Sequence, residues 1–239
     1  MLDARNDPVI FAYELDGRGG ATQVVDHLGS EAQSLVRWVH IDGNLIESPE
    51  HMAEFATALD SITAITLLDR DQRPRCVTID ENVLLILRGV NLNSDSSEED
   101  MVAARMWIQA NLVLTVSFRP LKTIDDLRAR LVANHGAKTT PEIVVQLCGR
   151  LLEHMDPVLT RLDEDTDAIE EQLIESPDAS LRKSIVDTRK RAILFRRYIG
   201  PQREAIGNFR RAEVSWLSTK DLRNLQENHD RVTRYMEDL

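Results

Sequence analysis

Four carboxylates in the second half of the chain are spaced so that they share one face of a helix. They follow one another at steps of seven, four and three residues, which return to nearly the same side of a helix. Hard cations such as Mg²⁺ take oxygen ligands, so this acidic stripe is a candidate for attracting or weakly binding a divalent cation. The alternative is a solvated face opposite an apolar seam. The four residues are Asp156, Asp163, Asp167 and Glu170.

The other residue types that do chemistry give weaker signals. No two of the six histidines have the HxH or HxxxH spacing of a metal site. His229 lies beside Glu227 and Asp230, so a role as a zinc ligand is one interpretation of this residue. Cys76 and Cys148 are far apart and are interpreted as small buried apolar side chains in a reducing compartment. The sequence has no GxxxxGKS/T, GxGxxG, GxSxG or HExxH motif, so we do not expect an enzyme.

The chain of 239 residues carries a formal net charge of −11, from 29 Lys and Arg against 40 Asp and Glu. This excess of acid argues against a nucleic-acid partner, because phosphate binding needs a basic face. The charge is uneven, since residues 181–239 hold 14 basic and 8 acidic residues, whereas residues 1–180 hold 15 and 32. The longest uncharged run, 106–118, has 13 residues, fewer than the about 20 that span a bilayer. We therefore expect no membrane span within this sequence.

Strand and helix signals alternate over residues 1–136. Helices are predicted from Ser48-Pro49, with apolar residues as far as Leu59, around 62–68 and over 121–132. The fold class is therefore α+β, and residues 1–136 form an α/β layer domain with a mixed, largely antiparallel sheet flanked by helices. Apolar and β-branched runs predict strands at 9–13, 36–41, 75–79, 83–90, 101–108 and 111–118.

From residue 140 onward the pattern is helical. Thr140 is predicted to cap a long helix, and a second long helix follows a break at 176–178. Two long helices joined by a short turn lie antiparallel, so residues 140–217 are predicted to form a helical hairpin. Ser218 and Asp221 have the spacing of a capping box that opens a third helix over 218–239. This helix has no stop signal, so we expect it to continue beyond residue 239.

The central block of the chain carries a specific resemblance. It runs Arg73-Pro74-Arg75-Cys76, then Leu85-Ile86-Leu87-Arg88-Gly89-Val90-Asn91-Leu92-Asn93, then Asp100-Met101, with Trp107 on the next strand. Three later groups fit the same pattern: Arg196-Arg197-Tyr198, Pro201-Gln202-Arg203 and Trp216-Leu217-Ser218. With this order of elements, essentially the whole chain resembles the zinc-transporter ZntB branch of the CorA family of divalent cation transporters.

The resemblance implies the cytoplasmic domain of a homopentameric divalent metal cation transporter. In this family a stalk helix, here starting at 218–239, leads to two transmembrane helices and a Gly-Met-Asn-type pore tripeptide, none of which lies in this sequence. The full-length protein is then expected in the cell inner membrane, with this part on the cytoplasmic side, where it contributes to a funnel, to assembly and to metal sensing. Residues 1–239 alone are expected to assemble weakly or in an altered way.

The transported ion implied by the resemblance is zinc, with magnesium or cobalt as the alternative within the family. No tightly bound cofactor is expected. Two interpretations that place the protein in another functional class remain open. One is a soluble scaffold that binds partners through the helical hairpin, and the other is an α/β enzyme with an unfamiliar site.

The resemblance also implies roles for two groups of basic and polar residues. If the second long helix faces the funnel of a pentamer, Arg203, Arg210 and Arg211 are candidates for binding anions such as chloride through charge-assisted contacts. The alternative is pairing with the acidic helix across the hairpin. The family signature is interpreted as structural, with two of its residues serving backbone geometry where a strand ends. The signature residues are Arg73, Pro74, Arg75, Arg88, Gly89, Asn91 and Asn93, of which Gly89 and Asn91 serve the backbone.

Overall fold

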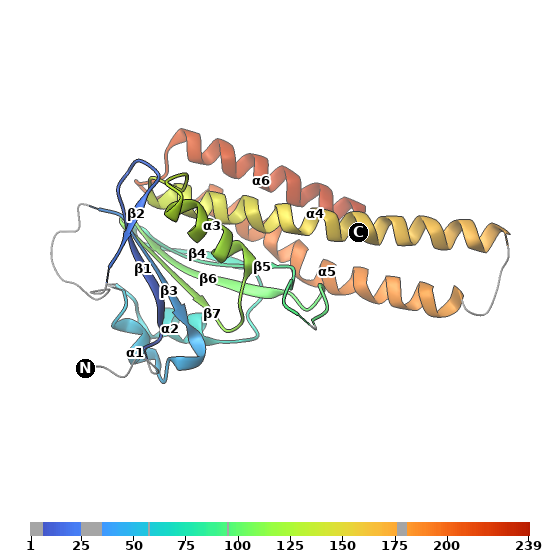
Figure 1. Ribbon diagram of the computed structural model, residues 1–239, viewed down its shortest axis with the longest axis horizontal. Helices are drawn as coiled ribbons and strands as arrows, with labels where there is room; N and C mark the ends of the chain where they lie inside the picture. Colours follow the sequence, from blue (N-terminus) through green and yellow to red (C-terminus); the bar gives the residue numbers. More distant parts are fainter. Residues whose placement is uncertain (1–6, 25–34, 57, 95, 176–180) are drawn as a thin grey trace.

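A seven-stranded sheet lies at one end of the molecule in the computed structural model, which describes residues 7–24, 35–56, 58–94, 96–175 and 181–239 (Figure 1). The strand order is β2-β1-β3-β7-β6-β5-β4. β3 and β7 pair in parallel, whereas every other neighbouring pair is antiparallel. This confirms the mixed, largely antiparallel sheet. The strands are β1 (Val9–Leu15), β2 (Ala21–Gln23), β3 (Arg37–Asp42), β4 (Arg75–Ile79), β5 (Asn82–Gly89), β6 (Val102–Gln109) and β7 (Leu112–Ser117).

Helices cover both faces of the sheet, and two of them extend far beyond it. Figure 1 shows α1 and α2 on one face and α3 to α6 on the other, with α4 and α5 running antiparallel out to the far end of the molecule. The α+β fold and the long helical hairpin are therefore confirmed. The helices are α1 (Pro49–Ala53), α2 (Ser61–Leu68), α3 (Lys122–Val132), α4 (Thr140–Glu175), α5 (Leu181–Arg210) and α6 (Thr219–Asp238), with a 3₁₀ turn at Gly43–Leu45.

Successive side chains of the central strands point to opposite faces of the sheet, so the apolar core is divided between the two faces. Val83 and Leu85 of β5 face the large cluster that includes α3 to α6, while Leu84 packs with residues of α1 and α2. The large cluster continues from the sheet to Val232 and Tyr235 of α6, so the sheet and the long helices share one core. The division into residues 1–136, 140–217 and 218–239 follows element boundaries and stays a prediction about folding units.

The start of α4 differs by one residue from the prediction. The cap is Thr139, whose Oγ1 accepts a hydrogen bond from the Glu142 N–H at 3.3 Å, and not Thr140. Thr140 is fully buried, and its hydroxyl donates to the carbonyl oxygen of Ala110 at 2.8 Å, in the turn between β6 and β7. This tertiary contact takes the Thr140 hydroxyl away from the helix end.

Two other helix starts have the predicted caps. At the start of α1, the Ser48 Oγ accepts a hydrogen bond from the His51 N–H at 3.2 Å. At the start of α6, Ser218 and Asp221 form the capping box. The first helix, α1, ends at Ala53, so it is shorter than the predicted helix, which extends to Leu59. The short strand β2 was not predicted, since three residues are too few for alternation to be visible. The predicted break at 176–178 lies outside the described residues.

The α5–α6 connection is fastened to the turn between β4 and β5. The Glu81 carboxylate accepts hydrogen bonds from the Ser215 N–H at 2.8 Å and from its hydroxyl at 2.7 Å. The backbone hydrogen bond from Ser215 holds the pKa of Glu81 below its usual value. The indole N–H of Trp216 donates to the Glu81 carbonyl oxygen at 2.7 Å. The base of α6 is thereby held to the edge of the sheet.

Helix α6 lies against both α4 and α5 over its whole length. The Asn228 side-chain amide donates to the Val145 carbonyl oxygen of α4 at 3.2 Å, and Leu225 and Val232 are fully buried in the shared core. An isolated helix of this length would be marginal in water, so its stability comes from this packing. Among the described residues, no helix combines the length and the apolar character needed to cross a membrane.

Candidate functional site

A groove of about 530 Å³ lies between α4 and α5 next to the end of α6, and it carries part of the predicted acidic stripe. Asp156, Asp163 and Glu170, each seven residues from the next, line the groove. Asp167, although it lies on the same side of the helix, is not part of the lining. The floor of the groove is apolar and includes Leu159, Leu162, Ile169, Leu173, Ile185 and Ala192.

The first carboxylate of the stripe is engaged by α6. The Tyr235 hydroxyl donates to the Asp156 Oδ1 at 2.7 Å, and an Arg231 guanidinium nitrogen lies 3.6 Å from the same oxygen. Burial, together with this hydrogen bond to Asp156, raises the pKa of Tyr235 to about 12. Asp156 therefore joins α4 to α6 within one subunit.

The other three carboxylates of the stripe, Asp163, Asp167 and Glu170, are exposed. Across the part of the chain that the structure describes, no three His, Cys, Asp or Glu side chains come together as a metal-binding group. The stripe is thus spread along the helix and does not form a closed coordination site within one subunit. His229 likewise belongs to no such group, and its Nδ1 lies 3.8 Å from Asp230. Weak attraction of divalent cations by the stripe stays a prediction.

Ion pairs join the hairpin to the loop between β5 and β6. Arg191 of α5 pairs with Asp165 of α4 at 2.9 Å, and it also lies 3.9 Å from Glu98 and from Glu99. Arg161 of α4 pairs with Glu98 as well. Pairing across the hairpin, the alternative to anion binding, is therefore present in α5 at Arg191.

Of the three arginines predicted to bind anions, Arg203 and Arg210 lie in the half of α5 nearest the sheet, and Arg211 directly follows the end of that helix. Arg210 donates to the Gln226 side chain of α6, while its Nε is buried and has no hydrogen-bond partner among the described residues. Arg211 is exposed and donates to the Asn208 side-chain oxygen at 2.7 Å. Arg203 lies seven residues before Arg210 on the same face and is half-buried. Their anion-binding role in a funnel stays a prediction.

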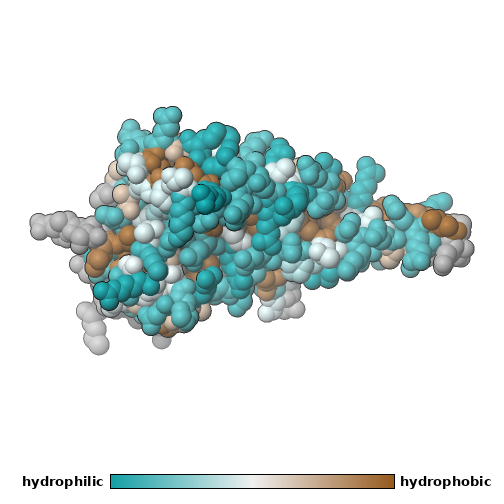
Figure 2. Space-filling view, turned by 90° about the horizontal axis from the view of Figure 1, so that it is seen from above, coloured by the Kyte–Doolittle hydropathy of each residue, from teal (hydrophilic) through white to brown (hydrophobic). Residues whose placement is uncertain are grey.

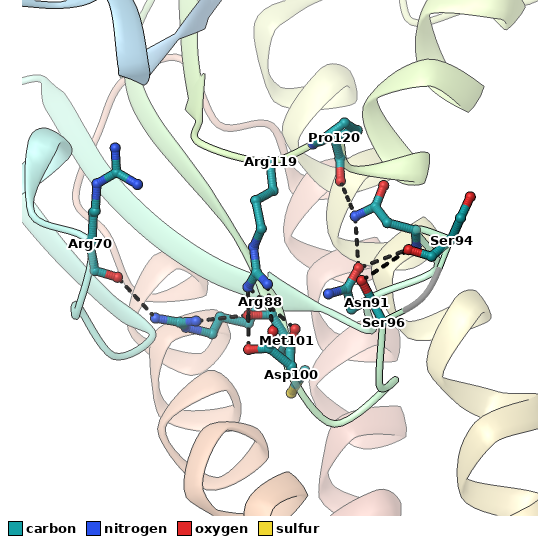
Figure 3. Close-up of polar contacts among 10 residues, drawn as sticks. Arg70, Arg88, Asn91, Ser94, Ser96, Asp100, Met101, Arg119 and Pro120 are labelled. Atoms are coloured by element: carbon teal, nitrogen blue, oxygen red, sulfur yellow. Dashed lines mark hydrogen bonds and ion pairs between the residues drawn. The ribbon is translucent and has the colours of Figure 1, made fainter.

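The signature residue Arg88 is buried and contacts three separate segments, and Figure 3 draws its contacts with Arg70 and Met101. Its backbone N–H donates to the Gln202 Oε1 of α5 at 2.7 Å. Its guanidinium donates to the carbonyl oxygens of Met101 at 2.8 Å and Gln72 at 2.9 Å, and it lies 4.4 Å from the ring centre of Tyr198. These contacts support the structural interpretation of this residue.

Gly89 allows close packing of neighbouring segments, whereas the sequence predicted a role in backbone geometry. It is not among the described residues with positive φ, so left-handed backbone geometry does not explain it. A Cβ at this position would lie 2.6 Å from a Leu151 methyl carbon and 3.1 Å from one of Leu121. Glycine therefore allows α4 and the segment before α3 to approach the end of β5 closely.

Two of the remaining signature residues, Asn91 and Asn93, support the loop after β5. Asn91 accepts hydrogen bonds through its Oδ1 from the Asn93 N–H at 3.2 Å and from the Asn93 side-chain amide at 2.7 Å, and this amide also donates to the Pro120 carbonyl oxygen at 3.0 Å. Of the first triplet, Pro74 is buried, and Arg73 and Arg75 are exposed, with Arg75 donating to the Thr66 hydroxyl at 3.2 Å.

Sequence reasoning missed one buried charge, Arg105 in the middle of β6. It is 2% exposed and donates only to backbone carbonyl oxygens, those of Asp69 at 3.0 and 3.2 Å and of Arg70 at 3.1 Å. The sequence feature that could have revealed this residue is a single arginine within an otherwise apolar strand. Such a residue is buried on both sides and needs a specific set of partners.

The fold is that of the cytoplasmic domain of a divalent-metal transporter. A solved structure of the ZntB cytoplasmic domain from Vibrio parahaemolyticus matches with a TM-score of 0.79 at 25% identity, over 97% of this chain and 91% of that one. The structure of the full-length CmaX protein matches with a TM-score of 0.87 at 30% identity, over 99% of this chain and 74% of that one.

The sequence places the chain in a particular family. It is 33% identical to the divalent cation transporter CmaX of Pseudomonas aeruginosa, over 97% of this chain and 71% of the relative. It is 28% identical to the zinc transport protein ZntB of Pectobacterium atrosepticum, over 99% of this chain and 72% of the relative. A family profile described as CorA-like Mg²⁺ transporter protein matches residues 34–239. The chain belongs to this CorA-like family, and the predicted likeness to its ZntB branch is confirmed.

Proposed function

We propose that this chain is the cytoplasmic part of a homopentameric transporter that moves zinc across the cell inner membrane. The observation that carries the proposal is the match to the ZntB cytoplasmic domain, which extends over 91% of that domain. The sequence relatives support transport of divalent cations. Magnesium or cobalt is the second candidate, favoured by the description of the matching family profile. Neither enzymatic activity nor a tightly bound cofactor is part of the proposal.

The acidic stripe would concentrate divalent cations near the protein without selecting among them. Residues 156–178 hold nine carboxylates and one arginine. Asp163 and Glu170 are exposed beside the groove, free to attract hydrated cations. Attraction between exposed charges is screened beyond about 8–10 Å at physiological salt, so the effect is local. The choice of ion would then belong to the pore and not to this stripe.

The three predicted parts would have separate tasks in the assembled transporter. Residues 1–136 form the outer layer domain, residues 140–217 the hairpin, and residues 218–239 the start of a stalk that leads to the membrane. Arg203, Arg210 and Arg211 would lie along the funnel and attract anions. Residues 1–239 offer only the short α6 of 20 residues as stalk surface, so we expect weak or altered assembly without the membrane segments.

Uptake by the full-length protein tests the transport proposal directly. The purified transporter is reconstituted into lipid vesicles that enclose a zinc-sensitive or a magnesium-sensitive dye. We expect external Zn²⁺ to enter at a rate well above that of protein-free vesicles and above that of Mg²⁺ at equal concentration. Entry of Mg²⁺ or Co²⁺ without Zn²⁺ would overturn the zinc assignment and leave the family function in place.

The oligomeric state provides an independent check. Light scattering of the full-length protein in detergent should give a pentamer, and the same measurement on residues 1–239 should give mainly smaller species at micromolar concentration. Vesicles that admit no divalent cation at all, from a protein shown to be pentameric, would contradict the proposal of cation transport.

A further inference from the structure

Four arginines line a small cavity of about 130 Å³ beside the end of β7. Arg88 comes from β5, Arg105 from β6, Arg70 from the segment after α2, and Arg119 from the segment after β7. Phe118 and two residues of β6 complete the lining, so no acidic side chain belongs to it among the described residues. The cavity shares no lining residue with the acidic groove, and Arg203, Arg210 and Arg211 are not part of its lining.

Two of the four guanidinium groups are buried without a carboxylate bonded to them. Arg88 is 7% exposed and Arg105 is 2% exposed. Every hydrogen bond that their guanidinium groups make with the described residues goes to a backbone carbonyl oxygen. The Nε of Arg88 is buried and has no hydrogen-bond partner among the described residues. An arginine presents five N–H donors, so donors remain unused at both residues.

The other two arginines lie at the exposed rim in fixed positions. Arg119 pairs with Asp100 at 2.5 Å and reaches the Met101 carbonyl oxygen at 3.3 Å (Figure 3). Arg70 donates to the Asn44 side-chain oxygen at 2.7 Å. Its guanidinium lies 4.4 Å from the ring centre of Phe118, and that of Arg105 lies 4.8 Å from the same ring. The positive groups are therefore held in place by contacts that an incoming ligand need not create.

Burial of like charges side by side is unfavourable without a counter-charge. Burial, and then the neighbouring charge of Arg88, lower the pKa of Arg105 to about 10. Burial also lowers the pKa of Arg88. The carboxylates of Asp69, Asp71 and Asp100 act on the buried pair from a distance, but none of them makes a hydrogen bond to its guanidinium groups, and Asp100 is bonded to the rim arginine Arg119. A small anion in the cavity would offset this excess of positive charge.

We propose that this cavity is a binding site for a phosphate-type oxyanion, held by Arg88 and Arg105 from inside and by Arg70 and Arg119 at the rim. Guanidinium groups bind tetrahedral oxyanions through paired N–H···O contacts, which suits a cavity with arginines on several sides. Its volume equals roughly four water molecules at about 30 Å³ each. It therefore has room for one phosphate group, either free in solution or at the end of a nucleotide whose remainder lies outside.

Calorimetric titration of the full chain with inorganic phosphate tests the site, with ionic strength held constant by sodium chloride. We expect saturable binding of one phosphate per chain. The double variant Arg70→Gln, Arg119→Gln changes only exposed side chains and should weaken binding roughly tenfold or more, since each lost contact is a charge-assisted hydrogen bond. Arg105→Lys keeps the positive charge but loses the planar guanidinium, which can form two parallel hydrogen bonds to an oxyanion, and should also weaken binding.

Arg161→Gln is the matched control, because Arg161 is also exposed and pairs with a carboxylate of the same loop, Glu98. This variant should bind phosphate like the parent. A second titration with ATP distinguishes the sources of the phosphate group. Displacement of phosphate by ATP would assign a nucleotide, and binding of phosphate without displacement by ATP would assign the free ion.

Two results would overturn the proposal. One is an absence of saturable binding of both phosphate and ATP to the correctly folded parent protein. The other is binding of the same strength in the parent and in the Arg70→Gln, Arg119→Gln variant, which would place the phosphate elsewhere. Because the rim variants leave the buried residues intact, the conclusion does not depend on whether the Arg105→Lys variant folds.

Discussion

The Tyr235 hydroxyl lies 2.7 Å from the Asp156 Oδ1, so one residue of the acidic stripe fixes α6 to α4. The two residues are 79 positions apart in the sequence and meet near the end of α6. Of the carboxylates that line the groove, this one has a partner on α6. The stripe therefore combines a structural residue at its start with exposed carboxylates further along.

Removal of this hydroxyl should loosen α6. Tyr235→Phe keeps the ring and deletes the contacts of the hydroxyl with Asp156, Arg231 and Leu152, so we expect the free energy of unfolding to fall by about 1.5–3 kcal/mol, the range for hydrogen bonds to charged groups. Urea unfolding followed by circular dichroism measures the change. Tyr198→Phe is the control, because its ring contacts Arg88 while its hydroxyl makes no hydrogen bond to the described residues. Equal losses in the two variants would show that the hydroxyl of Tyr235 has no special role.

A methyl group at position 89 should be costly. Gly89→Ala places a Cβ 2.6 Å from a Leu151 methyl carbon, and overpacking of this kind costs roughly 1–3 kcal/mol. Gly200→Ala is the matched control, since its Cβ would meet Met236 at an ordinary 3.6 Å and helix propensity favours alanine. Thermal unfolding should show a lower midpoint for the first variant and an unchanged or higher one for the second. A neutral Gly89→Ala would mean that the end of β5 and α4 can move apart freely.

Stability should fall in mild acid because of His40. Burial lowers the pKa of His40 to about 4, while Asp42 acts to raise it and Arg128 to lower it further. The unfolded chain binds a proton at this residue near pH 6.5, so unfolding is favoured increasingly as the pH falls from about 6.5 towards 4. The full effect of this one residue is roughly 3 kcal/mol, and it is absent above the pKa of the unfolded state.

Substitution of the histidine separates its effect from that of the carboxylates. In His40→Gln, the free energy of unfolding should depend less steeply on pH between about 6.5 and 4 than in the parent protein. The exposed His135→Gln should keep the slope of the parent. Urea titrations at a series of pH values measure both slopes. Identical slopes in all three proteins would place the acid sensitivity in other residues.

Loss of charge in the groove should reduce cation attraction slightly. Asp163→Asn with Glu170→Gln removes two carboxylates that line the groove, and we expect about a twofold rise in the half-saturating Zn²⁺ concentration of the full-length transporter at low salt. The effect should vanish at high salt, where exposed charges are screened. Glu164→Gln with Glu171→Gln removes two flanking carboxylates that do not line the groove and should have a smaller effect. A loss of more than tenfold would indicate direct ligation.

Most of the fold could be predicted from local patterns. The strands from β3 to β7 have clear apolar runs, and Ser48 and Ser218 have the chemistry of helix caps. The errors arose where tertiary contacts overrode a local rule. Thr140 is a good cap by type, yet its hydroxyl is used by Ala110. The first helix ends early even though Phe55, beyond its end, is buried like a helix-face residue.

The sites were harder to predict, because they depend on which strands become neighbours. Helical spacing correctly placed Asp156, Asp163 and Glu170 on one side of α4, since that needs only the geometry of a single helix. The arginine cavity needs β5, β6 and β7 to lie side by side, which brings Arg88, Arg105 and Arg119 together from separate positions in the chain. No local pattern specifies that order of strands.

The attachment of Trp216 to Glu81 makes the foot of α6 a pivot. The helix of 20 residues is about 30 Å long at 1.5 Å per residue. A tilt of about 5° about a fixed foot would displace its far end by roughly 2.6 Å over that length. Because α6 also lies against α4 and α5, such a tilt would carry the hairpin with it. A small rotation at the sheet edge would therefore become a larger displacement at the end of α6.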